Sequence, residues 1–277
     1  MNHVLPWRAS RRASDTAPAA VLEITGSEAR LTSCLRPGVT FPDWSVVTSA
    51  TAHGALVAML EAGWDRRSWQ GYTPAEDIVR HAILELYRDL GRAPSPEEIA
   101  HRADTGPDQV RLLLKRLAAR DLIVLEDDEI IGAYPLTDWP SEHRVVIADR
   151  ELHAMCAIDA LGVGAMYRAD TTINSRCRLC HASIYIATGD AGRYLATLSP
   201  AEAVVFTAVG YRGGCAATSL CTTIAFFCSD AHLSAWRSSQ SFEGPTFRLS
   251  IGEALEVGRA IFGPVLKAPQ DQPEVYR

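Results

Sequence analysis

The sequence predicts an α+β protein in which an N-terminal winged-helix-like three-helix domain precedes a mixed-strand domain with flanking helices. Three helix starts followed by a hairpin pattern predict the first domain, and β-branched runs between helical segments predict the second. The chain has 277 residues, of which 47% are hydrophobic, enough to bury the cores of two domains. We place an extension at residues 1–72, the winged-helix-like domain at 73–137 and the mixed-strand domain at 138–277.

The extension at residues 1–72 has the least regular pattern in the chain. Up to about residue 20 it mixes Arg, Ser, Pro and Ala without hydrophobic periodicity, which is typical of a disordered tail. Short strands are expected within residues 21–41, and the apolar spacing within 48–64 is compatible with a helix. No function follows from these residues.

Three helix starts mark the next domain. Thr73 and Glu76 form a capping box with Pro74 at the first helical position, and apolar residues then recur at helical spacing. Shorter helices are expected to begin after Ser95 and near Pro107. The domain therefore begins with three consecutive helices.

A hairpin is expected after the third helix, because two β-branched runs flank the acidic turn at residues 126–129. Three helices and a hairpin are typical of winged helices, many of which bind DNA. The third helix carries four cations in reach of phosphates: Arg111, Lys115, Arg116 and Arg120. However, four consecutive acids at the hairpin tip would repel a phosphate backbone, and the net charge of the chain is -6. We therefore expect a packing role for this domain and no nucleic-acid partner.

Strands and helices are interspersed in the mixed-strand domain, which follows an expected linker at residues 135–140. Strands are expected at residues 144–148, 171–175, 183–188 and 222–227, with a further short element within 200–210. Helices are expected around Cys156, from Ser229 to Trp236 and at 249–262.

The seven cysteines are unevenly placed, with Cys34 alone and six between Cys156 and Cys228. An odd, clustered set is not the pattern of a disulfide scaffold. The N-terminus lacks the apolar core of a secretory signal, and no run approaches the length of a membrane span. We therefore expect a cytoplasmic protein without membrane association, whose thiols are free, catalytic or metal-binding.

The run 177–181 reads Cys-Arg-Leu-Cys-His, which matches the haem-attachment pattern. Haem attachment belongs to exported proteins, so the missing export signal argues against it. As half of a zinc site the run lacks a second cysteine pair, although its own histidine or Cys215 could complete four ligands. A thiol that fills a turn between strands is the preferred interpretation for Cys180. His153 and His232 have no ligand pattern around them and are expected to be hydrogen-bonded or solvated.

Cys156 and Asp159 lie three positions apart in the otherwise apolar run 152–161. On a helix this spacing puts both groups on one face, about one turn apart. A buried carboxyl group is costly unless it is hydrogen-bonded or used, so this pair is a candidate site. The alternative is a helix N-terminus with Asp159 in solvent and Cys156 as small core filler.

Together with residues farther along the chain, this pair resembles the organomercurial lyases, also called alkylmercury lyases. The residues that carry the resemblance appear in order as Cys156 and Asp159, the stretch Asn174-Ser175-Arg176-Cys177 at the place of the family's Ser-x-x-Cys setting, Cys221 before the Phe-Phe-Cys-Ser run at 226–229, and Trp236. The resemblance extends from about residue 73 to 266 and leaves the extension outside it.

The resemblance implies an enzyme that cleaves carbon-mercury bonds by proton transfer to carbon and releases Hg(II) and a hydrocarbon. It implies that Cys156 and Cys221 are the two thiolate ligands of mercury and that Asp159 relays the proton. Cys177 matches a cysteine with a structural role. One departure is Met155, where family members carry Trp, and it bears on pocket shape and substrate choice. Three cysteines are additional to the pattern: Cys180, Cys215 and Cys228.

The chemistry of mercury supports these roles. Mercury is a soft cation, so two converging thiolates make a selective site. The second thiolate loads electron density on carbon, which then accepts a proton from an acid whose pKa is raised by burial. We expect no dissociable cofactor, a need for excess thiol, and transfer of Hg(II) to cellular thiols or a mercuric reductase. An apolar pocket for the organic group is one interpretation of four residues that are otherwise core: Ile158, Leu161, Phe226 and Phe227.

Two alternatives remain open at this point. In the first, a soft-metal-responsive winged-helix regulator senses metal through Cys156, Cys221 and one of Cys177 or Cys180. The acidic hairpin tip and Asp159, which a sensor does not need, argue against it. In the second, a lyase homologue performs a different thiol or metal chemistry, which the extension and the departure next to the first cysteine would accommodate.

Overall fold

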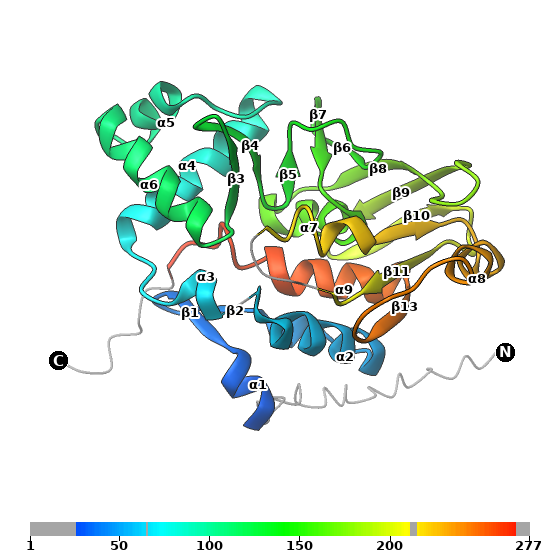
Figure 1. Ribbon diagram of the computed structural model, residues 1–277. Helices are drawn as coiled ribbons and strands as arrows, with labels where there is room; N and C mark the ends of the chain where they lie inside the picture. Colours follow the sequence, from blue (N-terminus) through cyan, green and yellow to red (C-terminus); the bar gives the residue numbers. More distant parts are fainter. Residues whose placement is uncertain (1–25, 65, 211–214, 270–277) are drawn as a thin grey trace, which may run out of the picture.

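The computed structural model describes residues 26–64, 66–210 and 215–269, and its main feature is one large antiparallel sheet (Figure 1). Its strands follow one another in the order β10-β9-β8-β6-β7-β5-β4-β3, and each neighbouring pair is antiparallel. Their bounds are β3 (Ile123–Glu126), β4 (Glu129–Ala133), β5 (Leu136–Thr137), β6 (Arg144–Ile147), β7 (Arg150–Ala154), β8 (Thr171–Arg176), β9 (Ser183–Gly189) and β10 (Tyr194–Ser199).

Two smaller sheets complete the strands of the described residues. The first is the hairpin of β1 (Ser33–Arg36) and β2 (Val39–Phe41), and the second has the order β12 (Ala225–Phe227), β11 (Val204–Ala208), β13 (Thr246–Ser250). The α-helices are α1 (Gly26–Leu31), α2 (Ala50–Met59), α3 (Arg66–Trp69), α4 (Pro74–Leu90), α5 (Pro96–Arg102), α6 (Pro107–Ala119), α7 (Ala157–Tyr167), α8 (Asp230–Arg237) and α9 (Ile251–Phe262). Short turns of 3-10 helix, η1 (Trp44–Val46) and η3 (Cys221–Thr223), and of π-helix, η2 (Leu60–Trp64), join them.

The predicted α+β class and the winged-helix-like order are confirmed. Helices α4, α5 and α6 precede the β3–β4 hairpin, and the capping boxes at Thr73 and Ser95 begin α4 and α5. The expected linker at 135–140 is wrong, because β5 lies within it and pairs with both β4 and β7. The hairpin therefore continues into the large sheet, although the three segment boundaries themselves stay predictions.

Most expected strands are present. The incorrect predictions concern residues whose secondary structure is determined by pairing with strands far away in the sequence. Strand β7 was expected to be helical in its second half, and β10 was not expected. The strand expected at 222–227 begins only at Ala225, after the turn η3. The last helix begins at Ile251, since Ser250 and Glu253 form its capping box, while Leu249 lies in β13.

Helix α7 lies at the centre of the molecule, between the large sheet and α9 (Figure 1). Glycines allow this close contact: a Cβ at Gly162 would lie 2.3 Å from Phe262 Cδ2, and one at Gly258 would lie 2.8 Å from the carbonyl oxygen of Ile158. Nearly all side chains of α7 are buried. The residues at its N-terminus are therefore held in a rigid, dry environment.

The described part of the extension packs against the rest of the protein. Helix α2 contacts α9 and β13, and the hydroxyl of Thr48 donates a 2.6 Å hydrogen bond to Glu256. The buried Arg36 forms an ion pair with Asp77 at 2.8 Å and donates to three backbone carbonyls near the end of α9. The predicted strands within 21–41 and helix within 48–64 are present, whereas the expected disordered tail lies outside the described residues.

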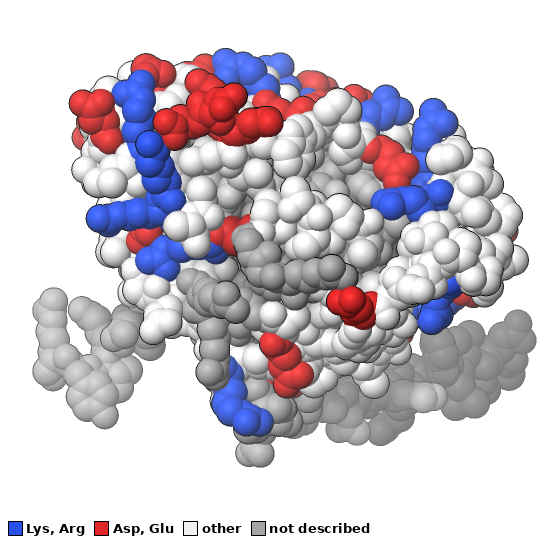
Figure 2. Space-filling view, in the orientation of Figure 1, with Lys and Arg blue, Asp and Glu red and all other residues white. Residues whose placement is uncertain are grey.

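The surface over α4 to α6 and the hairpin mixes acidic and basic side chains (Figure 2). Three of the four α6 cations form ion pairs within the chain: Arg111 with Glu97 and Asp108, Lys115 with Asp128, and Arg120 with the buried Glu76. These pairs agree with the packing role expected for this region. In the residues that were described, no helix is both long and apolar enough to cross a membrane.

Candidate active site

Cys156 is the N-cap of α7, with an extended backbone at φ -150°. The expectation that residues 152–161 form one helix is wrong, because Leu152 to Ala154 belong to β7 and the helix begins at Ala157. The expected proximity nevertheless holds. The backbone N–H of Asp159 lies 3.4 Å from Cys156 Sγ and donates to it, as a cap at this position requires. The alternative that placed Asp159 in solvent is wrong, since its exposed fraction is 5%.

Cys221 reaches the same place from a distant part of the chain. It lies in η3, and its Sγ donates to Asp159 Oδ2 at 3.6 Å. The sulfur atoms of Cys156 and Cys221 and a carboxylate oxygen of Asp159 all lie within 4.8 Å of one another. The two cysteines have exposed fractions of 1% and 7%. The structure therefore brings together the three residues that the sequence singled out.

Burial shifts the pKa values of all three side chains and so determines which of them carry protons. Burial raises the pKa of Asp159 from 3.8 to about 7, and hydrogen bonds from the two thiols offset only part of that shift. Burial also raises the pKa of the Cys156 thiol, while the hydrogen bond to Cys156 and burial raise that of Cys221. The carboxyl group can therefore hold or release a proton near neutral pH, and the thiols stay protonated until something takes their protons.

A narrow cavity of about 20 Å³ adjoins the three side chains. That is room for about one water molecule. Apart from the three, it is lined mainly by apolar groups: Met59, Tyr134, Ile158, Ala216, Leu220, Ile224 and Ile261. Of the expected pocket residues only Ile158 lines it, whereas Leu161, Phe226 and Phe227 are fully buried core. Met59 was not foreseen, because no local pattern connects α2 with a cysteine far along the chain.

The turn that leads to Cys221 is anchored to the end of the winged-helix region. Tyr134 donates a 2.8 Å hydrogen bond to Asp121 and accepts one from the backbone N–H of Ala217. The other carboxylate oxygen of Asp121 accepts from the N–H of Ala216 at 2.9 Å. Cys215 lies beside this network, 3.7 Å from the Tyr134 hydroxyl. No pattern in the sequence predicts the hydrogen bond between Tyr134 and Asp121, since residues at the two ends of a hairpin have ordinary structural roles.

Met155 lines a second cavity of about 370 Å³, together with Thr137, Trp139, His143 and Ala217 among others. Consecutive residues thus face the two cavities: Met155 the larger and Cys156 the smaller. The methyl group of Met155 occupies the space where a Cβ at Gly132 would lie. Met155, the residue at which this chain departs from the family pattern, therefore shapes the larger cavity beside the site.

The other cysteines are placed elsewhere in the described chain. Cys177 and Cys180 group with Cys228 and His232, away from the three residues above. The expectation that His232 has no ligand pattern around it is wrong, and Cys215, proposed as a possible fourth ligand, is not part of the group. Cys34 lies in β1 and is exposed, and all seven cysteines are free thiols.

Comparison with known proteins relates the region of the site to one family. The model of the family described as alkylmercury lyase matches residues 136–263, the range that contains all three clustered residues. The predicted resemblance to the alkylmercury lyase family is thereby confirmed for the part of the chain that holds the site. Among curated members, the alkylmercury lyase of Streptomyces lividans is 25% identical over 65% of this chain and 79% of its own length. The alkylmercury lyase of Staphylococcus epidermidis is 26% identical over 69% of this chain and 84% of its own.

Two further matches bear on the fold. The crystal structure of the mercury-bound form of MerB2 is similar with a TM-score of 0.61 and 23% sequence identity, covering 79% of this chain and 100% of that one. Residues 77–129 also match the family model of Sigma-70 region 3, in agreement with the helical domain formed by α4 to α6. The chain thus shares its fold with that structure.

Proposed function

We propose that this protein is an organomercurial lyase that cleaves carbon-mercury bonds by protonolysis and yields Hg(II) and a hydrocarbon. The observation that carries the proposal is the convergence of two thiols and a carboxyl group within 4.8 Å in a buried site. The match of residues 136–263 to the alkylmercury lyase family model and the names of the curated relatives support it.

The reaction follows from the protonation states. The substrate is an organomercurial that carries a thiolate from solution. Asp159, in its carboxylate form, takes the proton of one site thiol, and that sulfur bonds to mercury. The second site thiol replaces the solution thiolate, which leaves as a thiol with the second proton. Mercury then carries the organic group and two protein thiolates, Cys156 and Cys221.

The proton held by Asp159 completes the reaction. Two thiolates push electron density onto mercury and weaken its bond to carbon, because sulfur is a soft, strongly donating ligand. The carbon takes the proton as the carbon-mercury bond breaks, so a hydrocarbon leaves and Hg(II) stays bound to Cys156 and Cys221. A pKa of about 7 suits both halves of this cycle, since the carboxyl group must accept a proton and then give it back.

The surroundings favour this chemistry. The apolar lining keeps water away from the polarised carbon and strengthens the electrostatic interactions within the site. The cavity is too small for an organomercurial as it stands, so the side chains around it must move when substrate binds. We propose that the protein needs no dissociable cofactor, acts in the cytoplasm, and passes Hg(II) to excess thiol or to a mercuric reductase.

The test is hydrocarbon release from methylmercury and phenylmercury under excess thiol, measured by headspace gas chromatography. We expect turnover by the wild type and by Cys34→Ser, which removes an exposed thiol outside the site and serves as the matched control. Cys156→Ser and Cys221→Ser should abolish release, and Asp159→Ala or Asp159→Asn should lower it by about 10²–10⁴-fold, the usual contribution of a general acid. A wild type that binds mercury but releases no hydrocarbon would overturn the proposal.

A further inference from the structure

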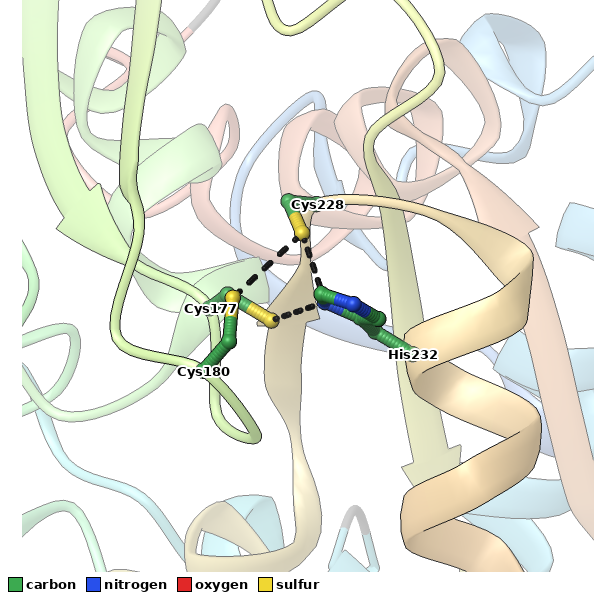
Figure 3. A group of neighbouring side chains, drawn as sticks. All are labelled: Cys177, Cys180, Cys228 and His232. Atoms are coloured by element: carbon green, nitrogen blue, oxygen red, sulfur yellow. Dashed lines mark hydrogen bonds between the residues drawn. The ribbon is translucent and has the colours of Figure 1, made fainter.

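Four side chains from two distant segments converge at the end of the large sheet, apart from the site described above. Cys177 and Cys180 lie in the loop after β8, Cys228 directly follows β12, and His232 lies in the first turn of α8 (Figure 3). We call this group the Cys3His cluster. Figure 3 shows its three sulfur atoms and the imidazole ring turned toward a common centre.

The distances within the Cys3His cluster fit a tetrahedral metal. The Cys180 and Cys228 sulfur atoms are 3.7 Å apart, and His232 Nδ1 lies 3.8 Å from Cys177 Sγ and 3.0 Å from Cys228 Sγ. All four ligand atoms lie within 4.8 Å of one another. A tetrahedral zinc ion with bonds of about 2.3 Å to sulfur and about 2.0 Å to nitrogen separates its ligand atoms by about 3.5–3.8 Å. Two of the three distances given above already match this range or lie at its upper end, and the separation of each remaining pair of ligand atoms needs to change by about 1 Å at most.

The backbone holds both halves of the cluster in place. In the loop, the N–H of His181 donates to the carbonyl of Cys177 at 2.9 Å, and the N–H of Cys177 donates to the carbonyl of Ala182 at 2.9 Å. These bonds make the tight turn that a Cys-x-x-Cys pair needs to point both thiols at one atom. The N–H of Arg178 donates to the carbonyl of Phe226 at 3.0 Å, which fixes the loop against β12.

The second half uses a strand-to-helix junction. Ser229 is the N-cap of α8 and accepts from the N–H of His232. This cap orients the first turn so that the residue before it, Cys228, and the imidazole four positions later face the same point. Each half thus has backbone hydrogen bonds of its own that orient its pair of ligands.

The donor set and its exposure distinguish this cluster from the buried site. Three thiols and one imidazole form a closed Cys3His set of the kind that structural zinc sites use, and none of the four ligands is a carboxylate. Cys180 is exposed, and Cys228 and His232 are partly exposed, so a metal ion can reach the cluster from solvent. The Cys156, Asp159 and Cys221 group is fully buried and has only two thiols.

We propose that the Cys3His cluster binds one Zn²⁺ ion tetrahedrally and that this ion fastens the β8–β9 loop to the β12–α8 junction. Binding converts the three thiols to thiolates and releases their protons to solvent, while the imidazole binds in its neutral form through Nδ1. The bound ion supports the segment that follows Cys221, because Phe226 and Phe227 lie between Cys221 and Cys228. This zinc is structural and takes no part in the reaction at the buried site.

The test is the metal content of the full-length protein, purified from zinc-supplemented, mercury-free cells and measured by inductively coupled plasma mass spectrometry. We expect about one zinc ion per chain in the wild type. Cys180→Ser and His232→Ala should lose the metal. The double variant Cys156→Ser/Cys221→Ser and the exposed control Cys34→Ser should keep it, which separates this site from the buried one.

A second measurement remains decisive if a variant does not fold. Cobalt added to metal-free wild-type protein should give the intense visible bands of tetrahedral Co²⁺ and a thiolate charge-transfer band in the ultraviolet, and zinc should displace both. The proposal is overturned if the wild type holds no stoichiometric zinc and gives no such spectrum. It is also overturned if zinc remains bound to the Cys180→Ser and His232→Ala proteins. A Cys180–Cys228 disulfide in protein purified from cells under reducing conditions would overturn it as well.

Discussion

Replacement of Asp159 by asparagine should stabilise the protein by an amount that depends on pH in a defined way. The carboxyl group is buried, and burial raises its pKa from 3.8 to about 7. The folded protein therefore binds this proton more tightly than the unfolded chain does. Because ionisation of a buried carboxyl group is unfavourable, the folded protein loses stability as the pH rises from about 4 to about 7.

The size of the effect follows from the difference between the two pKa values. Roughly three pKa units correspond to about 4 kcal/mol, which is the expected cost of the ionised carboxyl group at pH 8. At pH 5 the same calculation gives about 2 kcal/mol, and below about pH 4 the cost fades. Asparagine has nearly the same shape and no charge, so Asp159→Asn should recover most of this free energy at pH 8 and little of it at pH 4.

Urea unfolding of both proteins at several pH values, followed by circular dichroism, measures the difference directly. Other titrating groups are shared by the two proteins and cancel. Asp149→Asn removes one exposed carboxylate from the turn between β6 and β7 and controls for the change in net charge. A stability difference that stays flat with pH, or an asparagine variant that is less stable at pH 8, would refute the protonated, buried carboxyl group.

Three further changes test the surroundings of the site. Tyr134→Phe removes the hydrogen bond to Asp121 and should lower the free energy of unfolding in urea by about 1–3 kcal/mol. It should also lower kcat/KM by about tenfold or more, because the turn before Cys221 would be misplaced. Gly162→Ala should destabilise the protein by about 1–3 kcal/mol in the same assay, because its Cβ would lie 2.3 Å from the ring of Phe262. Met155→Trp fills part of the larger cavity and should lower the ratio of phenylmercury to methylmercury kcat/KM by about tenfold, measured by headspace chromatography.

Local signals predicted the helices well because helix ends are decided by neighbours in the sequence. The capping boxes at Thr73 and Ser95 need only residues three positions apart, and the structure contains both. The run around Cys156 was harder. Its first half pairs with β5 and β6, and those hydrogen bonds outweigh the helical pattern of its apolar residues. The close contact of Cys156 with Asp159 was still predictable, because a spacing of three also fits an N-cap.

The residues that line the site could not be predicted from the sequence, because long-range contacts bring them together and no short motif encodes such contacts. Met59 comes from the extension, which had no recognised role, and it lines the cavity because α2 packs on α9. The sequence did not identify two ligands of the Cys3His cluster, Cys228 and His232, for a similar reason. Cys228 and His232 are four positions apart across a strand-to-helix junction, and their partners lie nearly fifty residues earlier in the chain. The hydrogen bond from the Arg178 N–H to the carbonyl of Phe226, which joins the ends of two different sheets, and the cap at Ser229 bring them together.

The two cysteine groups differ in the number of ligands that they offer to a soft metal, and this difference determines what a bound metal can do in each. A closed set of four donors leaves no position for a substrate, so a metal held by the Cys3His cluster can only stabilise the fold. Two thiols and a carboxyl group leave positions open on the metal and keep a mobile proton beside it, as protonolysis requires. An organomercurial can therefore be protonated at carbon only where it meets the two thiols and the carboxyl group of the buried site.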